Sequence, residues 1–121
     1  MAKILLIEDS EMLQRAFKRV LRDHQLVVVG NGLNALAELE GGQFDLVISD
    51  YDIDGPLNGE DVYLWVQSNR PELLKRYIFC SANSRSQEIC KRDGILYLDK
   101  GSPAASPTNL RLAVEIGRAH V

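Results

Sequence analysis

The stretch DLVISD at residues 45–50 decides the fold of this chain. Its apolar residues follow one another without the polar alternation of a half-exposed strand, which is typical of a strand buried on both faces. The stretch ends on the carboxylate of Asp50. Residues 4–7 form a second run of this kind, and the acidic pair Glu8 and Asp9 follows it directly. Two expected strands therefore end in carboxylates.

Two later apolar runs also lead to polar side chains. Residues 77–80 are followed by Ser81, and residues 95–98 lead to Lys100. The carboxyl ends of parallel strands share one edge of the sheet, and ligands bind at that edge. We therefore expect carboxylates, a hydroxyl and an ammonium group to meet at one point. Such a set suits Mg²⁺ together with a phosphoryl group.

The hydrophobic period alternates between strand and helix along the chain. Strands are expected at residues 4–7, 26–29, 44–49, 77–80 and 95–98, and helices after Ser10 and at residues 33–40, 60–68, 84–92 and 108–118. Ser10 is expected to cap the first helix, whose inward stripe includes Met12 and Phe17. Strict alternation with short connections predicts an α/β domain, residues 1–121, with a parallel sheet covered by helices on both faces.

Composition narrows the class of protein. The chain has 121 residues, enough for one domain with a hydrophobic core, and a net charge of −3. This charge argues against nucleic-acid binding through a basic surface. The densest basic cluster, Arg70, Lys75 and Arg76, is interpreted as a solvated face. No apolar run approaches the roughly 20 residues that span a bilayer, so no membrane contact is expected.

The remaining compositional features favour a cytoplasmic protein. The first three residues lead straight into an expected strand, so a cleaved signal peptide is not expected. The two cysteines, Cys80 and Cys90, lack metal-type spacing. We interpret both as small hydrophobic fillers of a reduced protein, not as a disulfide or redox pair.

The acidic residues carry the expected chemistry. Glu8, Asp9 and Asp50 would repel one another at one sheet edge, and a divalent cation that prefers oxygen ligands removes the conflict. Asp50 needs no general base as a covalent acceptor, because a carboxylate is already ionised at neutral pH. Ser81 offers a hydroxyl donor to a phosphoryl oxygen, and Lys100 offers a point charge. Taken singly, each residue has a simpler interpretation as a turn former, backbone hydrogen-bonder or surface charge.

The chain resembles the receiver domain of two-component response regulators over nearly all of its length. The segments that carry the resemblance are KILLIED at 3–9, GNGLNALAEL at 30–39, DLVISDYDIDGP at 45–56, YIFCSA at 77–82 and ILYLDK at 95–100. The resemblance implies a flavodoxin-like, doubly wound parallel sheet with strand order 2-1-3-4-5 and five helices. It also implies signal transduction through an aspartyl phosphate, without enzymatic activity beyond self-phosphotransfer and autodephosphorylation.

The resemblance implies a role for each acid at the site. Asp50 looks like the phosphoacceptor. Asp9 and Asp50 look like the side-chain ligands of Mg²⁺, with Glu8 acting through water and Asp52 through its backbone carbonyl.

Three further residues receive roles in the same way. Ser81 resembles the hydroxyl that senses the phosphoryl group, and Lys100 resembles the lysine that pairs with it. Tyr97 resembles the aromatic residue that turns inward on activation. A simpler interpretation of Tyr97 is strand packing with an exposed hydroxyl.

The resemblance also implies partners. The phosphoryl donor would be a sensor histidine kinase or a histidine phosphotransfer protein, and the output a change in binding to a downstream protein target. By analogy, kinase choice is expected on the first helix, around Leu13, Arg15, Ala16 and Arg19. The domain would be a monomer or a weak, phosphorylation-dependent dimer, with no nucleic acid bound by this domain.

This sequence departs from the family pattern in two places. The family commonly has Met-Pro three and four residues past the acceptor, where this chain has Ile53 and Asp54, and Pro56 comes later. We therefore expect a remodelled loop beside the metal site, with Asp52 adding a carboxylate. Gly101 follows Lys100 where the family usually has proline. The segment from Ser81 to Lys100 is also short, which predicts an abbreviated fourth helix.

Two rival functions come from other classes. Asp50-Tyr51-Asp52 resembles the Asp-x-Asp motif of haloacid-dehalogenase phosphohydrolases. In that family the motif comes first in the chain, whereas here Glu8 and Asp9 precede it, and no cap domain fits. The other rival is a degenerate receiver that binds proteins without being phosphorylated.

Overall fold

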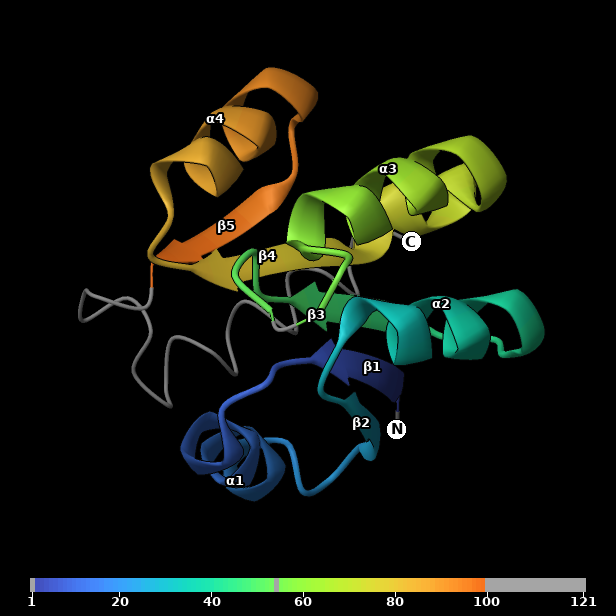
Figure 1. Cartoon of the computed structure of the whole chain (residues 1–121). Coiled ribbons are helices and arrows are strands. Elements are labelled where there is room, and N and C mark those ends of the chain that lie inside the picture. Colours follow the sequence, from blue (N-terminus) through green and yellow to red (C-terminus); the bar gives the residue numbers. More distant parts are fainter. Residues whose placement is uncertain (1, 54, 100–121) are drawn as a thin grey trace.

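Five apolar runs form a parallel sheet in the order β2-β1-β3-β4-β5 (Figure 1). The computed structural model describes residues 2–53 and 55–99. The strands are β1 Lys3–Ile7, β2 Gln25–Val29, β3 Leu46–Ser49, β4 Tyr77–Ser81 and β5 Leu96–Asp99. The strand order confirms the flavodoxin-like, doubly wound sheet predicted from the sequence.

Helices connect the strands. They are α1 Glu11–Val20, α2 Gly32–Gly41, α3 Gly59–Asn69 and α4 Ser84–Asp93, with a 3₁₀ helix, η1, at Pro71–Arg76. The predicted ranges of α2, α3 and α4 agree with these bounds to within one residue at each end, and α1 begins directly after Ser10 as predicted. The fourth helix is ten residues long, the same length as α1 and α2. The η1 helix was not predicted. The expected closing helix at residues 108–118 lies outside the described residues.

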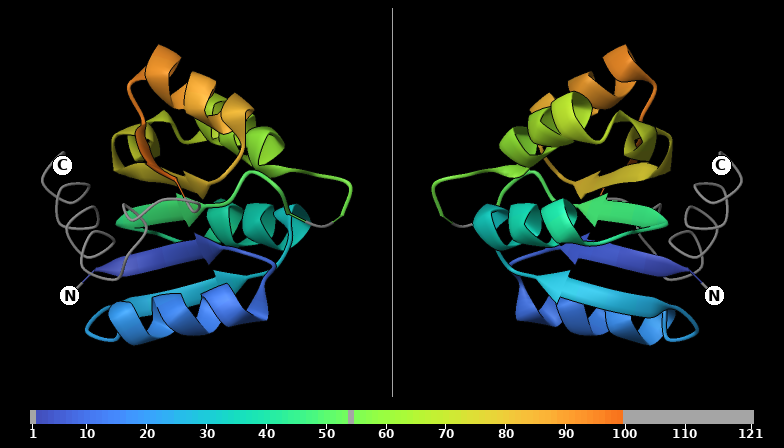
Figure 2. Two further views of the ribbon diagram at one scale, coloured as in Figure 1. Left: turned by 90° about the vertical axis from the view of Figure 1, so that its left-hand side faces the viewer. Right: turned by 90° about the vertical axis from the view of Figure 1, so that its right-hand side faces the viewer.

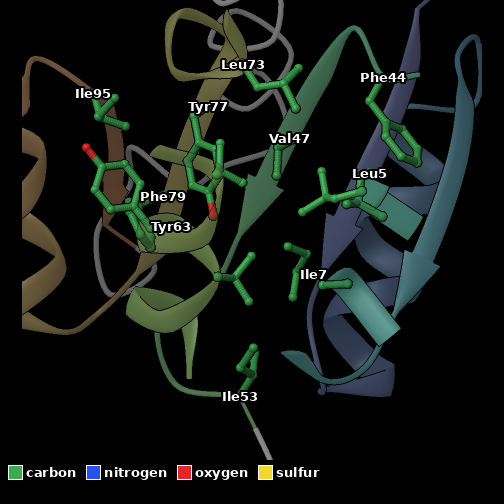
Figure 3. Close-up of a cluster of buried hydrophobic side chains, with 14 of the residues drawn as sticks. Leu5, Ile7, Phe44, Val47, Ile53, Tyr63, Leu73, Tyr77, Phe79 and Ile95 are labelled. Atoms are coloured by element: carbon green, nitrogen blue, oxygen red, sulfur yellow. The ribbon is translucent and has the colours of Figure 1, made fainter. Parts of the chain in front are cut away.

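Each strand of the sheet contributes side chains to two hydrophobic layers, one on each face, because successive side chains point to opposite faces. In β1, Leu5 and Ile7 join the layer beneath α2, α3 and α4, whereas Ile4 and Leu6 join the layer beneath α1. Figure 2 shows α1 on the opposite side of the sheet from the other described helices. The larger layer contains the aromatic side chains Tyr63, Tyr77 and Phe79, which pack against one another (Figure 3).

Burial confirms some of the predicted core residues and corrects others. Phe17 is buried against the sheet, but Met12, predicted to face inward with it, is 73% exposed. Met12 precedes Phe17 by five residues, which places it about 140° around the helix from the buried face, so it points away from the sheet. Cys80 and Cys90 are both buried and are not disulfide-bonded, as the filler interpretation requires. Among the described residues, no helix has the length and apolarity that crossing a membrane would need.

Arg70 is not part of a solvated face, so that interpretation is wrong for this residue. Its guanidinium donates to the carbonyl oxygens of Leu39 (2.8 Å) and Gly42 (3.2 Å), at the end of α2. Its side chain is only 19% exposed. The last carbonyls of a helix lack intrahelical partners, and a cation there satisfies them. Arg70 thus stabilises the end of α2.

The loop between β3 and α3 is held close to the sheet. Ile53 is buried at the carboxyl edge of the larger layer, near Ile7 (Figure 3). Asn58 and Asp61 form a reciprocal capping box at the start of α3. Gly59 packs so tightly that an added Cβ would lie 2.5 Å from the Tyr51 Cα atom and closer still to the Asp50 carbonyl. The backbone of the acceptor segment and the first residue of α3 therefore allow no side chain between them.

We expect Gly59→Ala to lower the free energy of unfolding by about 2 kcal/mol or more, because the methyl group meets backbone that cannot rotate away. Chemical denaturation followed by circular dichroism measures the change. Gly41→Ala is the matched control, since an added Cβ there meets nothing within 4 Å. That control should be neutral or stabilising by up to about 1 kcal/mol. Equal effects of the two substitutions would contradict the tight packing at Gly59.

Candidate metal and phosphoryl site

Three carboxylates meet at the carboxyl edge of the sheet. Glu8 and Asp9 follow β1, and Asp50 follows β3, whose last residue pairs with the last residue of β1. One carboxylate oxygen from each residue lies within 4.8 Å of the others. Glu8 is 1% exposed and Asp50 is 7% exposed. The sequence prediction that these acids converge is therefore confirmed.

Backbone hydrogen bonds fix where Glu8 and Asp50 leave the sheet. The Asp50 N–H donates to the Ile7 carbonyl at 3.0 Å, and the Glu8 N–H donates to the Val29 carbonyl at 3.0 Å. The Gln14 side chain in α1 donates to the Glu8 carbonyl at 2.6 Å. The two backbone bonds extend the hydrogen-bonding pattern of the sheet by one residue beyond the ends of β1 and β3. The sequence analysis did not anticipate Gln14, because its partner is a backbone atom.

The Asp50 side chain and carbonyl are both held. The Ser49 hydroxyl donates to the Asp50 carbonyl at 2.8 Å, entirely within the core. The Asp52 N–H donates to Asp50 Oδ1 at 3.3 Å. This second bond holds the Asp52 backbone close to the Asp50 carboxylate.

Ser81 ends β4, the next strand along the sheet from β3. It is fully buried, and its hydroxyl oxygen accepts the Asn83 N–H at 3.0 Å. Asn83 also caps α4, where its side chain accepts the Arg85 N–H at 2.7 Å. Its amide group donates to both Asp52 carboxylate oxygens, at 3.3 and 3.4 Å. Asn83 therefore joins the Ser81 segment to the Asp50 segment.

Tyr97 lies on β5 beside Ser81. Its hydroxyl donates to the Ser81 carbonyl at 3.0 Å, and its ring packs against the larger hydrophobic layer. Burial is the main reason that the pKa of Tyr97 is raised. The side chain is half-buried and its hydroxyl is hydrogen-bonded, so simple strand packing with an exposed hydroxyl does not describe it. Lys100, the remaining predicted residue, lies outside the described residues.

The donor set fits a small hard cation. Carboxylate oxygens and a nearby backbone carbonyl are the ligands that Mg²⁺ and similar ions prefer, and Mg²⁺ keeps several water ligands when it binds to one or two carboxylates. Glu8, Asp9 and Asp50 supply those oxygens at a distance that one ion can bridge. The residues present therefore fit a divalent cation, and Asp52 is close enough in the chain to add its carbonyl.

One polar cluster beside the site was missed by the sequence analysis. Tyr51, Glu60 and Arg85 form a chain of hydrogen bonds from the residue after Asp50 to the start of α4. Asn83 could have been found as a helix cap before the 84–92 helix, because asparagine is a preferred cap. The Glu60–Arg85 pair has no such local signal, since its members lie 25 residues apart.

Comparisons with known proteins give a consistent picture. The family model for the response regulator receiver domain matches residues 4–103. The chemotaxis protein CheY-3 of Vibrio cholerae is 27% identical over 90 residues, 72% of this chain and 68% of that protein.

Solved structures share the fold. A response regulator receiver domain protein from Clostridium thermocellum has a TM-score of 0.81 at 20% identity, covering 98% of this chain and 95% of that one. The response regulator TrrA from Thermotoga maritima, solved in complex with Mg²⁺-BeF, has a TM-score of 0.80 at 22% identity, covering 97% and 99%.

We expect Mg²⁺ to stabilise the folded protein. At 100 times its dissociation constant, the ion should add about 2.7 kcal/mol, or about 10 °C in Tm, by mass action. Asp9→Asn and Asp50→Asn should each lose most of this shift in a thermal unfolding experiment. Asp23→Asn, an exposed aspartate outside the cluster, should keep it. An equal shift in all four proteins would show that the acidic cluster does not bind the ion.

Proposed function

The chain belongs to the response regulator receiver domain family, and on this premise we propose that Asp50 accepts a phosphoryl group with the help of Mg²⁺. The observation that carries the proposal is the convergence of Glu8, Asp9 and Asp50 at the ends of two paired strands, with Glu8 and Asp50 buried. Ser81 ends the next strand and supplies a buried hydroxyl on the same edge. In the proposal the whole chain, residues 1–121, is one receiver domain.

The reaction is a transfer between two partners. A carboxylate oxygen of Asp50 forms a bond to phosphorus, while the bond from phosphorus to a donor histidine nitrogen breaks and its electron pair returns to the imidazole. The donor is a histidine kinase or a histidine phosphotransfer protein. Asp9, Asp50 and the Asp52 carbonyl would hold Mg²⁺, with Glu8 acting through water, and the ion would supply charge neutralisation at the transferring group. Lys100 adds a positive charge in the same role.

Ser81 and Tyr97 would transmit the change. The Ser81 hydroxyl oxygen accepts the Asn83 N–H, and its O–H hydrogen can still be donated to a phosphoryl oxygen. Tyr97 is bonded to the Ser81 carbonyl, so a shift of Ser81 reaches β5. The altered surface would then select a downstream protein target.

Neither rival is favoured. A phosphohydrolase would require its Asp-x-Asp motif after the first strand of the site, whereas Glu8 and Asp9 follow β1, and Asp50 and Asp52 follow β3. A degenerate receiver would retain the fold but not the acceptor chemistry. Phosphorylation with a small-molecule donor separates these cases.

Incubation with acetyl phosphate and Mg²⁺ should add one phosphoryl group, detected by mass spectrometry and removed by hydroxylamine. Asp50→Asn should abolish the gain, because the amide nitrogen cannot form the mixed anhydride. Asp52→Asn is the matched control and should keep the gain, since only the Asp52 carbonyl is assigned to the metal. A gain that survives Asp50→Asn would refute Asp50 as the acceptor. No gain in the wild type would favour the degenerate receiver, and steady release of phosphate from unrelated monoesters would favour the hydrolase.

Ser81→Ala should slow phosphorylation by acetyl phosphate about 10- to 100-fold, the equivalent of one charge-assisted hydrogen bond. The hydroxyl is buried and is replaced by a smaller apolar group, so the fold should survive. Quenched-flow mixing followed by mass spectrometry measures the rate of phosphorylation. Ser49→Ala is the control for loss of a buried hydroxyl, because the Ser49 hydroxyl lies within the core and donates to a backbone carbonyl, that of Asp50. An unchanged rate in Ser81→Ala would remove Ser81 from the proposed site.

A further inference from the structure

Two polar links cross from the segment after Asp50 to the start of α4. In the first, the Asn83 side chain donates to Asp52. In the second, the Tyr51 hydroxyl donates to Glu60 Oε1 at 2.9 Å, and Arg85 donates to both oxygens of the same carboxylate, at 3.3 and 3.0 Å. Tyr51 is the residue after Asp50, Glu60 lies in the first turn of α3, and Arg85 lies in the first turn of α4.

The second link is stronger than an ordinary surface ion pair. Most exposed pairs contribute little, but a two-point contact between a guanidinium and a carboxylate has a defined geometry. The Glu60 side chain is 21% exposed and the Arg85 side chain 45% exposed. The pKa of Glu60 lies below its ordinary value, chiefly because Arg85 donates to it, and the Tyr51 hydroxyl acts in the same direction. The carboxylate is therefore held by two elements at once.

The position of the link decides what it can do. The start of α3 and the start of α4 both lie at the carboxyl edge of the sheet (Figure 1), the edge that also holds the acidic cluster. The Gly59 N–H donates to the Tyr51 carbonyl at 2.7 Å, so Tyr51 is held at both its backbone and its hydroxyl. Its neighbour on one side is Asp50, and on the other side is Asp52. Any movement of Tyr51 would displace both.

At the other end, the link reaches the segment that contains Ser81. Arg85 follows the cap Asn83 by two residues, and the Asn83 N–H donates to the Ser81 hydroxyl. The first turn of α4 thus has polar contacts to both halves of the site. At the far end of α4, Asp93 accepts the Tyr63 hydroxyl of α3 at 2.6 Å. The helix is tied to the α3 side at each end.

We propose that Arg85 is a positioning residue for the metal site: through Glu60 and Tyr51 it holds the Asp50–Asp52 backbone, so that divalent-cation affinity and the placement of α4 are coupled. This inference rests on the proposed function, because it assigns the cation to the acidic cluster. Coupling between two sites is reciprocal. Loosening the first turn of α4 should therefore weaken binding of the ion, and binding of the ion should stabilise that turn.

An effect of the Glu60–Arg85 pair through its charges alone would change cation affinity differently from an effect through positioning. Arg85→Gln removes one positive charge near the acids, whereas Glu60→Gln removes one negative charge. If the pair acts only by its field, Arg85→Gln strengthens cation binding and Glu60→Gln weakens it. If the pair acts by positioning, both substitutions break the same contact and both weaken binding. The sign of the Arg85→Gln effect separates the two explanations.

The experiment measures Mn²⁺ affinity from the electron paramagnetic resonance signal of the free ion, with Mg²⁺ as competitor. Arg85→Gln and Glu60→Gln should each weaken binding about fivefold or more. The double variant should bind Mn²⁺ no more weakly than the single variant with the lower affinity, because both substitutions remove the same contact. Tyr51→Phe, which changes no charge, should act in the same direction with a smaller effect.

Matched controls come from the same helix. Glu88 also contacts Arg85, at 3.5 Å, but its side chain is 70% exposed and is not part of the link that joins Tyr51, Glu60 and Arg85. Glu88→Gln repeats the charge change of Glu60→Gln, and Lys91→Gln repeats that of Arg85→Gln. Both should leave Mn²⁺ affinity within about twofold. Thermal unfolding without metal checks that each variant is folded.

A second readout does not depend on affinity. Hydrogen exchange of the α4 amides should slow when Mg²⁺ is added to the wild type, and this slowing should be lost in Arg85→Gln. Tighter binding in Arg85→Gln, or unchanged affinity in both substitutions, would overturn the positioning role while leaving phosphorylation of Asp50 intact. A wild type that binds no divalent cation would overturn the proposed function, and this inference with it.

Discussion

The register between β1 and β3 is the constraint on which the rest of the structure depends. Both strands are apolar on both faces, so the polarity of the faces does not select one register. The ends of the strands do. At the start, the Asp45 side chain and backbone bond to the Lys3 backbone, each at 2.8 Å. At the finish, a slip of one residue would draw the carboxylate of Glu8 or Asp50 into the apolar sheet, where an unpaired charge is costly. The same groups that could bind a cation therefore also fix the sheet.

The loop after Asp50 shows how a departure in sequence can be compensated by packing. Ile53, at the position where the sequence comparison with the family led us to expect a remodelled loop, is buried in the core. The chain then returns to the sheet through Leu57, which packs on Gly32 of α2 so closely that an added Cβ would lie 2.7 Å from the Leu57 Cβ atom. Gly59 completes the return against the Asp50 carbonyl. Apolar burial at one end and two close glycine contacts at the other anchor the loop after Asp50.

Sequence patterns predicted most of the sheet and its acids because these depend on local order: an apolar run, a polar end and a short connection. They failed where a side chain finds its partner in three dimensions. Met12 belongs to the apolar run of α1, yet it lies about 140° around the helix from the buried Phe17 and is exposed. Arg70 looks like a surface cation, yet it satisfies carbonyls about 30 residues earlier in the chain. The link from Glu60 to Arg85 exists only because β3 and β4 are neighbours, which no spacing along the chain records.

Ser81 lies where these contacts meet, and its bonding favours a discrete change over a gradual one. Its hydroxyl accepts the Asn83 N–H, and its carbonyl accepts the Tyr97 hydroxyl. Buried polar groups of this kind are seldom left without a partner, because each unpaired group costs about 1–3 kcal/mol. A shift of Ser81 toward the acidic cluster would have to break or carry both bonds together. Intermediate positions would leave groups unpaired, so the α4 start and the Tyr97 side chain would move with Ser81 or stay with it.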